Sequence, residues 1–206
     1  IFYASIARAA MQGTVPEPRS ILTPMISLFL FTTPVITMGL LSEEQKTGTI
    51  ELLMTAPLKT ADILIGKWLA SFLFLSTIAS IPVFFLVYLN FLVDPGIDWG
   101  ISISGYLGIF LLLSSFTAIG VAASSFFSNQ IASFFAAFAI IMVLWLIDVP
   151  AQTGPEFLKA LDLGEHFYNS FYEGIIKGTD IIYYISVTAV SLFTGMTSLE
   201  SRRWRA

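Results

Sequence analysis

The sequence contains no cysteine and a single histidine among 206 residues. The missing cysteines exclude a disulfide framework, thiolate metal sites and a cysteine nucleophile, and one imidazole is too few for a histidine metal cluster. Charged residues are also scarce, at 12% of the chain against about 25% in soluble domains. Because 14 acidic residues outnumber 10 basic ones, the chain has little to offer a phosphate backbone, and no nucleic-acid partner is expected.

Apolar residues dominate the sequence, at 56% of the chain, and 19 of them are phenylalanines. A soluble protein of this length would still expose about 30% of the surface of its unfolded chain. Such a molecule cannot bury so large an apolar fraction, which excludes an ordinary soluble enzyme, and a disordered chain is excluded by the high hydrophobicity itself. We therefore expect an integral membrane protein.

The charged residues leave four long stretches uncharged, namely 20–42, 68–93, 99–147 and 181–199. A helix needs about 20 apolar residues to cross the hydrocarbon core, so three stretches hold one span each and the longest holds two, joined by a polar turn at 128–130. The runs lack the alternation of barrel strands. The expected fold is an all-α integral membrane protein, a single transmembrane domain over residues 1–206, with spans at about 20–42, 68–92, 103–126, 131–148 and 181–199.

Lysine and arginine are denser on one side of the expected membrane. Loop 43–67, turn 128–130 and tail 200–206 hold six in 35 residues, and the opposite segments hold four in 57. The positive-inside rule predicts that the denser side, with the C-terminus, is cytoplasmic. Residue 1 then lies outside, and the first residues read like the end of a helix, so we expect a first span to be missing and six in total. The alternative is a true five-span protein.

The cytoplasmic segment 43–60 predicts a short amphipathic helix. Thr49 can cap this helix, Pro57 ends it, and Gly48 interrupts helical structure just before it. Ile50, Leu53 and Met54 follow at i, i+3 and i+4 and form one apolar face. Two interpretations stay open, docking into the groove of a partner or a passive helix on the membrane surface. Thr60 and Asp62 are expected to start the next helix.

The outer segment 150–180 is too long for a plain connection, so short helices are expected within it. Phe157 and Leu161 belong to a first amphipathic piece, and Phe167, Phe171 and Ile175 follow at i, i+4 and i+8 in a second. Both pieces are expected to lie on the outer leaflet. They form either a lid over a pathway or an aromatic belt at the interface.

The chain has no Walker A sequence, so it cannot bind ATP in the usual phosphate cradle. His166 is expected to be an interfacial residue, and no paired catalytic groups are identifiable. No charge falls near the middle of a span, which disfavours an ion pump, so the energy for any transport must come from elsewhere. Small residues at 118–125 predict a close helix-packing surface.

One cytoplasmic motif resembles a known family. Residues 41–57 read LSEEQKTGTIELLMTAP, an acidic and basic cluster followed by Gly-Thr-hydrophobic-Glu, a leucine pair and a proline stop. This order resembles the signature loop of type-2 ABC transporter permeases. Residues 63–67 resemble the start of the family's next span, and supporting matches to the gliding-motility-type subgroup lie at 105–108, 118–120 and 124–130, with 199–204 also fitting. The resemblance covers roughly residues 21–206.

The resemblance implies the transmembrane domain of a type-2 ABC exporter, with five visible spans of a probable six, a cytoplasmic coupling helix and short outer-leaflet helices. The coupling helix would sit in a cleft of an ATPase. The coupling residues carried onto this chain are Glu43, Glu44, Lys46, Gly48, Thr49, Ile50, Glu51, Leu53 and Met54. The outer helices would close the exit, with gate residues Phe157, Leu161, Phe167, Phe171 and Ile175.

The implied function is that of a permease subunit of an ATP-driven exporter in the inner (plasma) membrane. Its partners would be separate ABC ATPase subunits, a second permease subunit in a homodimer or heterodimer, and membrane lipids. ATP would be bound by the ATPase, so the chain itself is expected to be no enzyme and to hold no cofactor or metal. The alternative is a non-transporting structural or regulatory membrane subunit. Spans rich in Phe and Leu suit lipid-like cargo and lipid contact equally.

Overall fold

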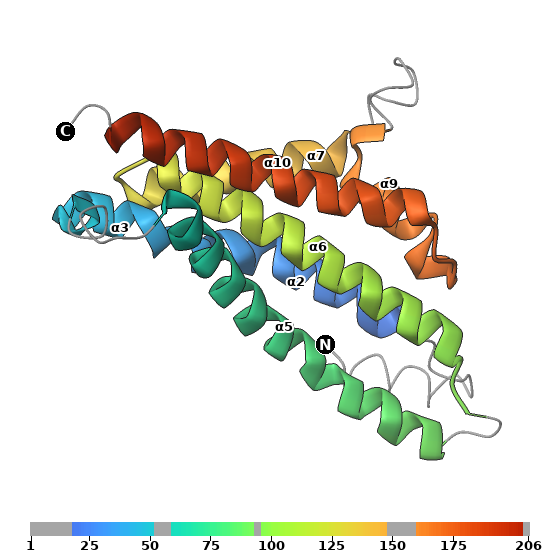
Figure 1. The fold of residues 1–206 in the computed structure, drawn as a ribbon. Coiled ribbons are helices and arrows are strands. Elements are labelled where there is room, and N and C mark those ends of the chain that lie inside the picture. Colours follow the sequence, from blue (N-terminus) through green and yellow to red (C-terminus); the bar gives the residue numbers. More distant parts are fainter. Residues whose placement is uncertain (1–17, 52–58, 93–95, 148–159, 204–206) are drawn as a thin grey trace.

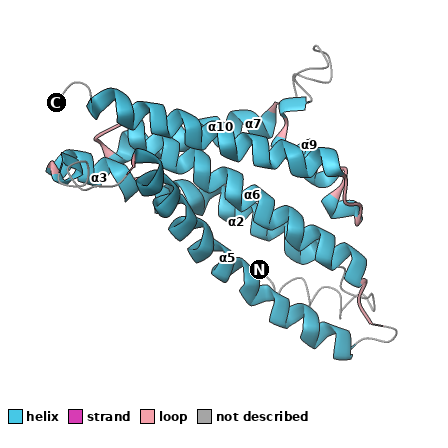
Figure 2. Cartoon of the chain, viewed as in Figure 1, coloured by secondary structure: helices cyan, strands magenta, loops and turns pink. Residues whose placement is uncertain are grey.

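The computed structural model describes residues 18–51, 59–92, 96–147 and 160–203, and these residues fold into helices with no strand among them (Figures 1 and 2). This confirms the expected all-α fold. In chain order the elements are α2 (Arg19–Thr37), α3 (Gly39–Thr47), α5 (Thr60–Leu92), α6 (Trp99–Phe126), α7 (Gln130–Leu146), α9 (Leu163–Tyr168), the 3-10 turn η2 (Phe171–Glu173) and α10 (Gly178–Arg203).

Four of the described segments are long and apolar enough to cross a membrane, namely Arg19–Thr47, Thr60–Tyr88, Trp99–Phe126 and Gly178–Ser201. The fifth expected span corresponds to α7, an apolar helix of 17 residues, which measures about 25 Å along its axis. The count of spans stays a prediction. The polar turn between the two middle spans is confirmed, because Asn129 precedes α7 and its side chain accepts a hydrogen bond from the Ile131 N–H.

Helix α6 is the centre of the bundle, and it contacts α2, α5, α7 and α10 (Figure 1). Its apolar window is 78% buried, against 28% for α5 and for α10. The predicted packing surface at 118–125 is confirmed, since each of these residues is buried. Small residues permit this close packing because they let neighbouring backbones approach.

Two glycines of α6 show how close the approach is. A Cβ atom added at Gly108 would lie 2.7 Å from the Phe171 Cβ and 2.8 Å from the Phe167 Cε2. A Cβ atom at Gly120 would overlap the Thr37 hydroxyl of α2. The absence of a side chain at these positions therefore lets α2 and the α9–η2 segment lie directly on α6.

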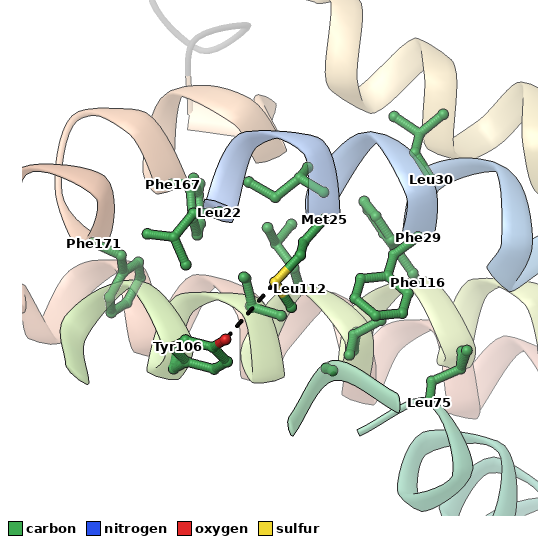
Figure 3. Close-up of a cluster of buried hydrophobic side chains, with 14 of the residues drawn as sticks. Leu22, Met25, Phe29, Leu30, Leu75, Tyr106, Leu112, Phe116, Phe167 and Phe171 are labelled. Carbon is green, nitrogen blue, oxygen red and sulfur yellow. Dashed lines mark hydrogen bonds between the residues drawn. The ribbon is translucent and has the colours of Figure 1, made fainter. Parts of the chain in front are cut away.

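The main apolar cluster joins the inner faces of α2, α5, α6 and α10 to α9 and η2 (Figure 3). Phe116 and Leu112 of α6 pack there with Phe29 and Met25 of α2, and the Tyr106 hydroxyl donates to the Met25 sulfur at 3.9 Å. The cluster extends to Phe167 and Phe171, which are fully buried. One continuous core thus runs from the middle of the bundle to α9.

The bundle has two ends, which we name after the short helices that lie there. The α3 end gathers α3, the start of α5, the turn before α7 and the last turns of α10, and the α9 end gathers the start of α2, the start of α6, α9 and η2 (Figure 1). The described parts of the lysine- and arginine-rich segments, 43–51, 59–67 and 200–203, therefore lie at one end of the bundle.

Candidate functional site

The first candidate site is α3 and the chain that follows it. Helix α3 ends at Gly48, which has φ 74° and is a left-handed C-cap, and helical structure resumes at Thr49. Only glycine enters this conformation without penalty. The predicted break at Gly48 is confirmed. The Thr49 hydroxyl lies within hydrogen-bond distance of the Thr47 hydroxyl, at 2.9 Å, and also of the Glu44 carbonyl at 3.4 Å, so it links the new helix back to α3.

Gln45 fixes α3 to the end of α6. Its amide nitrogen donates to the Ser125 carbonyl at 2.8 Å and lies 3.4 Å from the Ser124 carbonyl. The last carbonyls of a helix have no partner within it, so they are free to accept such bonds. The Ser198 hydroxyl of α10 donates to the same Ser125 carbonyl at 3.1 Å. One carbonyl at the end of α6 therefore joins α3, α6 and α10.

Lys67 fixes α3 to α5. Its ammonium group lies 2.6 Å from a Glu44 carboxylate oxygen and donates to the Leu40 carbonyl at 2.6 Å. The side chains of Lys67 and Glu44 are 21% and 28% exposed, so the pair is shielded from much of the solvent. Sequence reasoning had assigned Glu44 to contacts with a partner. The structure gives it this partner within the chain.

An apolar cluster lies beneath these polar links. Ile50 packs against the buried residues Leu41, Leu64, Val121 and Leu199, which come from α3, α5, α6 and α10. The coupling role that the resemblance implies for Ile50 stays a prediction, and its side chain packs against the membrane part of the bundle. Leu53 and Met54, assigned to the same face, lie outside the described residues.

The outward face of the segment carries charge. Glu43, Lys46, Gly48, Thr49 and Glu51 are all exposed. One face of the segment is thus fixed to the bundle through Gln45, Lys67 and Ile50. The opposite face exposes acidic and basic side chains to solvent. The sequence pattern does not predict the contacts of Gln45, Lys67 and Ser198, because no sequence period connects residues 23 to 80 positions apart.

The second candidate site is the predicted outer gate at the α9 end. Phe167 and Phe171 are fully buried against α6, whereas Leu161 and Ile175 are 43% and 51% exposed. Phe157 lies outside the described residues. The spacing of these side chains predicted one helix through 167–175, and this is wrong. The helix α9 ends at Tyr168, Ser170 leaves helical geometry with φ −136° and ψ −83°, and η2 follows.

Polar contacts attach this cap, residues 160–174, to three spans. Arg19 of α2 pairs with Glu173 at 2.8 Å and donates to the Tyr172 carbonyl at 3.1 Å. Ser104 of α6 donates to the Phe171 carbonyl at 2.8 Å, and Tyr184 of α10 donates to the Leu163 carbonyl at 2.7 Å. The cap is therefore anchored by backbone carbonyls rather than by apolar contact alone.

His166 has a more specific position than an interfacial residue needs. Its Nδ1 lies 2.7 Å from an oxygen of Asp180, which is 4% exposed, and its ring stacks on Tyr183 with centroids 4.0 Å apart. Asp162, 1% exposed, caps α9 by accepting from the Gly164 N–H at 2.7 Å. Burial, followed by the charge of the nearby Tyr172, raises the pKa of Tyr168 above its usual value. No group of three metal-ligating side chains occurs within the described residues.

The comparisons with known proteins fit this architecture. A family model described as "ABC-2 family transporter protein" matches residues 3–194. No curated protein matches the chain. The family match spans nearly the whole sequence, and the helices long enough to cross a membrane fall within or mostly within it. The chain therefore belongs to the ABC-2 transporter family and is a permease component of an ABC transporter, a multi-pass membrane protein.

Proposed function

We propose that the chain is the transmembrane subunit of an ATP-driven exporter and that residues 39–51 receive the motion of a separate ATPase. The observation that carries this proposal is the two-sided character of the segment. Its front exposes Glu43, Lys46 and Glu51, and its back is bonded to α5 and α6. A passive helix on the membrane surface would have no need for this second set of bonds.

The contacts behind the segment give a route for transmission. A push on α3 reaches α6 through Gln45 and reaches α5 through the Glu44–Lys67 pair. Helix α6 continues without interruption to the α9 end, where Ser104 and Gly108 contact Phe171. Rigid-body movement of α6 would therefore act on both ends of the bundle together.

The orientation follows from charge. The α3 end faces the cytoplasm in this proposal, because Lys46, Lys59 and Lys67 gather there with Arg202 and Arg203 in the last turn of α10. ATP is bound and hydrolysed by the partner subunits, and two permease subunits enclose the pathway. The cap at the α9 end then closes the exit, with Phe167 and Phe171 as its buried anchor.

The test uses the absence of cysteine. A single cysteine placed at exposed Ile175 carries a spin label at the α9 end, with no competing thiol among the 206 residues of this chain. In the complex with its ATPase, we expect ATP to change the label's mobility or its distance to the label on the second subunit. Glu51→Lys should abolish this response while ATP hydrolysis continues, because the exposed contact charge is reversed.

The matched control is Glu200→Lys, which reverses another exposed acidic residue at the α3 end outside the segment. It should leave the response unchanged. A response that survives in Glu51→Lys at the wild-type size would exclude the coupling role of the segment. A stable complex that hydrolyses ATP with no label response in the wild type would favour the non-transporting structural subunit.

A further inference from the structure

An apolar groove of about 600 Å³ lies between α5 and α6 in the half of the bundle nearest the α9 end. This volume falls in the range of ligand sites, about 300–1,000 Å³. Leu86, Ser102 and Tyr106 form its buried floor, with 2%, 2% and 8% exposure, while Phe84 and Ile103 at its rim are 78% and 62% exposed. The groove is therefore open at the side of the bundle and closed beneath.

The polar side chains in the lining already have partners. The Ser80 and Ser102 hydroxyls donate to carbonyls of their own helices, both at 2.8 Å. The Tyr106 hydroxyl donates to the Met25 sulfur, and the Trp99 N–H donates to Asn90 at 3.2 Å. Since water in a cavity needs two to four polar partners, this lining favours hydrocarbon over water.

The groove is continuous with the apolar surface that α5 presents to its surroundings. Tyr88 and Phe91, one and two turns beyond Phe84, are 61% and 82% exposed. In a multi-pass membrane protein such a surface faces lipid tails. An acyl chain can therefore enter the groove from the bilayer without crossing a polar layer.

A charged residue adjoins the lining of the groove in the chain. Asp98 precedes Trp99 and is exposed, and it caps α6 by accepting from the Gly100 N–H at 2.8 Å. Asn90 accepts from the Ile97 N–H and from Trp99, which holds the join of α5 and α6 in place. A tryptophan at the first residue of a helix long enough to cross a membrane suits the headgroup layer. The carboxylate of Asp98 attracts an ammonium headgroup and repels an anionic one.

We propose that the groove between α5 and α6 is a binding site for one phospholipid of the leaflet at the α9 end. An acyl chain lies on Leu86 and Tyr106, and the ammonium of an ethanolamine headgroup lies near Asp98. The bound lipid fills space that helix packing leaves open and supports α5, whose apolar window is only 28% buried by protein. This site is separate from the coupling segment proposed above.

Tryptophan quenching by brominated acyl chains tests the proposal in vesicles that contain the full chain. Trp99 lines the groove, and Trp99→Phe gives the background from the other tryptophans. Brominated phosphatidylethanolamine should quench Trp99 with saturation at a low mole fraction, and brominated phosphatidylglycerol should do so only at a higher one. Asp98→Asn keeps the helix cap and should abolish this difference between headgroups.

A pair of variants on one helix supplies the control. Val83→Phe fills the groove, and Val87→Phe adds the same ring one turn away, outside the lining. Val83→Phe should raise the half-saturating lipid fraction about tenfold, the loss expected when about two methylene contacts are displaced. Val87→Phe should match the wild type.

Three results would overturn the proposal. The first is quenching that rises linearly with lipid fraction and ignores the headgroup, which indicates bulk lipid contact only. The second is a wild-type Trp99 that brominated lipid does not quench until residues 1–17 are deleted, which assigns the groove to that segment. The third is a Trp99 that brominated lipid quenches only after dilution of the protein to the monomer, which assigns the groove to a second copy of the chain. If Val83→Phe does not fold, the Asp98→Asn comparison decides between the same outcomes.

Discussion

Gly48→Ala isolates the free-energy cost of the break within the coupling segment, between α3 and the helical residues that resume at Thr49. Gly48 has φ 74°, and a Cβ atom added there meets nothing within 4 Å. The substitution is therefore free of collision, and its cost is the backbone penalty of a left-handed alanine, about 1–2 kcal/mol. Asparagine enters this conformation more readily, so Gly48→Asn should lose less.

Amide hydrogen exchange provides the assay, because it reports the free energy of local opening. We expect the amides of the last turn of α3 and of Thr49–Glu51 to exchange about 5–30 times faster in Gly48→Ala, with the centre of α6 unchanged. Gly48→Leu should equal Gly48→Ala, because the site has open space. Exchange at the wild-type rate in Gly48→Ala, or a much larger effect of leucine, would refute the reasoning.

The remaining predictions concern packing and the polar link at the α3 end. Gly120→Ala should lower the free energy of unfolding by about 1–3 kcal/mol because its Cβ overlaps Thr37, and Thr37→Ala should recover part of the loss. Gly66→Ala, where nothing lies within 4 Å, should instead raise it by about 1 kcal/mol. Lys67→Met should lower the free energy of unfolding by about 2 kcal/mol, less than the roughly 3–5 kcal/mol lost when a fully buried ion pair is broken. Adding Glu44→Gln should recover part of this loss. Thermal unfolding in detergent, followed by circular dichroism, measures all of these; a loss in Gly66→Ala equal to that in Gly120→Ala, or no recovery in the Lys67 and Glu44 double variant, would contradict them.

The sequence was sufficient where local chemistry decides structure. The start of α5 at Thr60, the turn before α7 at Asn129 and the break at Gly48 follow from residues that cap or terminate helices by their own side chain or backbone. The packing face at 118–125 follows from small side chains in an apolar run. These features depend on neighbours within about one turn of helix, so the pattern alone predicts them.

The sequence was insufficient where a contact joins distant segments. The spacing of Phe167, Phe171 and Ile175 predicted one helix, but helical geometry ends at Ser170. Side chains from three other helices donate hydrogen bonds to backbone carbonyls of this segment, namely Arg19, Ser104 and Tyr184. The His166–Asp180 pair shows the same limit. The sequence shows only that Asp180 is an acidic residue in the first turn of α10, and such a residue is also favourable there without any histidine partner.

The scarcity of charge by itself determined that this chain belongs in a membrane, because the free energy of burying apolar runs depends on composition and not on which residues meet. The family resemblance in residues 41–57 is likewise a property of the chain order. Only the tertiary structure decided that Glu44 is paired within the chain, that α6 is the buried centre and that α5 leaves an apolar groove beside it. Those outcomes depend on which side chains face each other across neighbouring helices, and no periodicity along one helix specifies its neighbour.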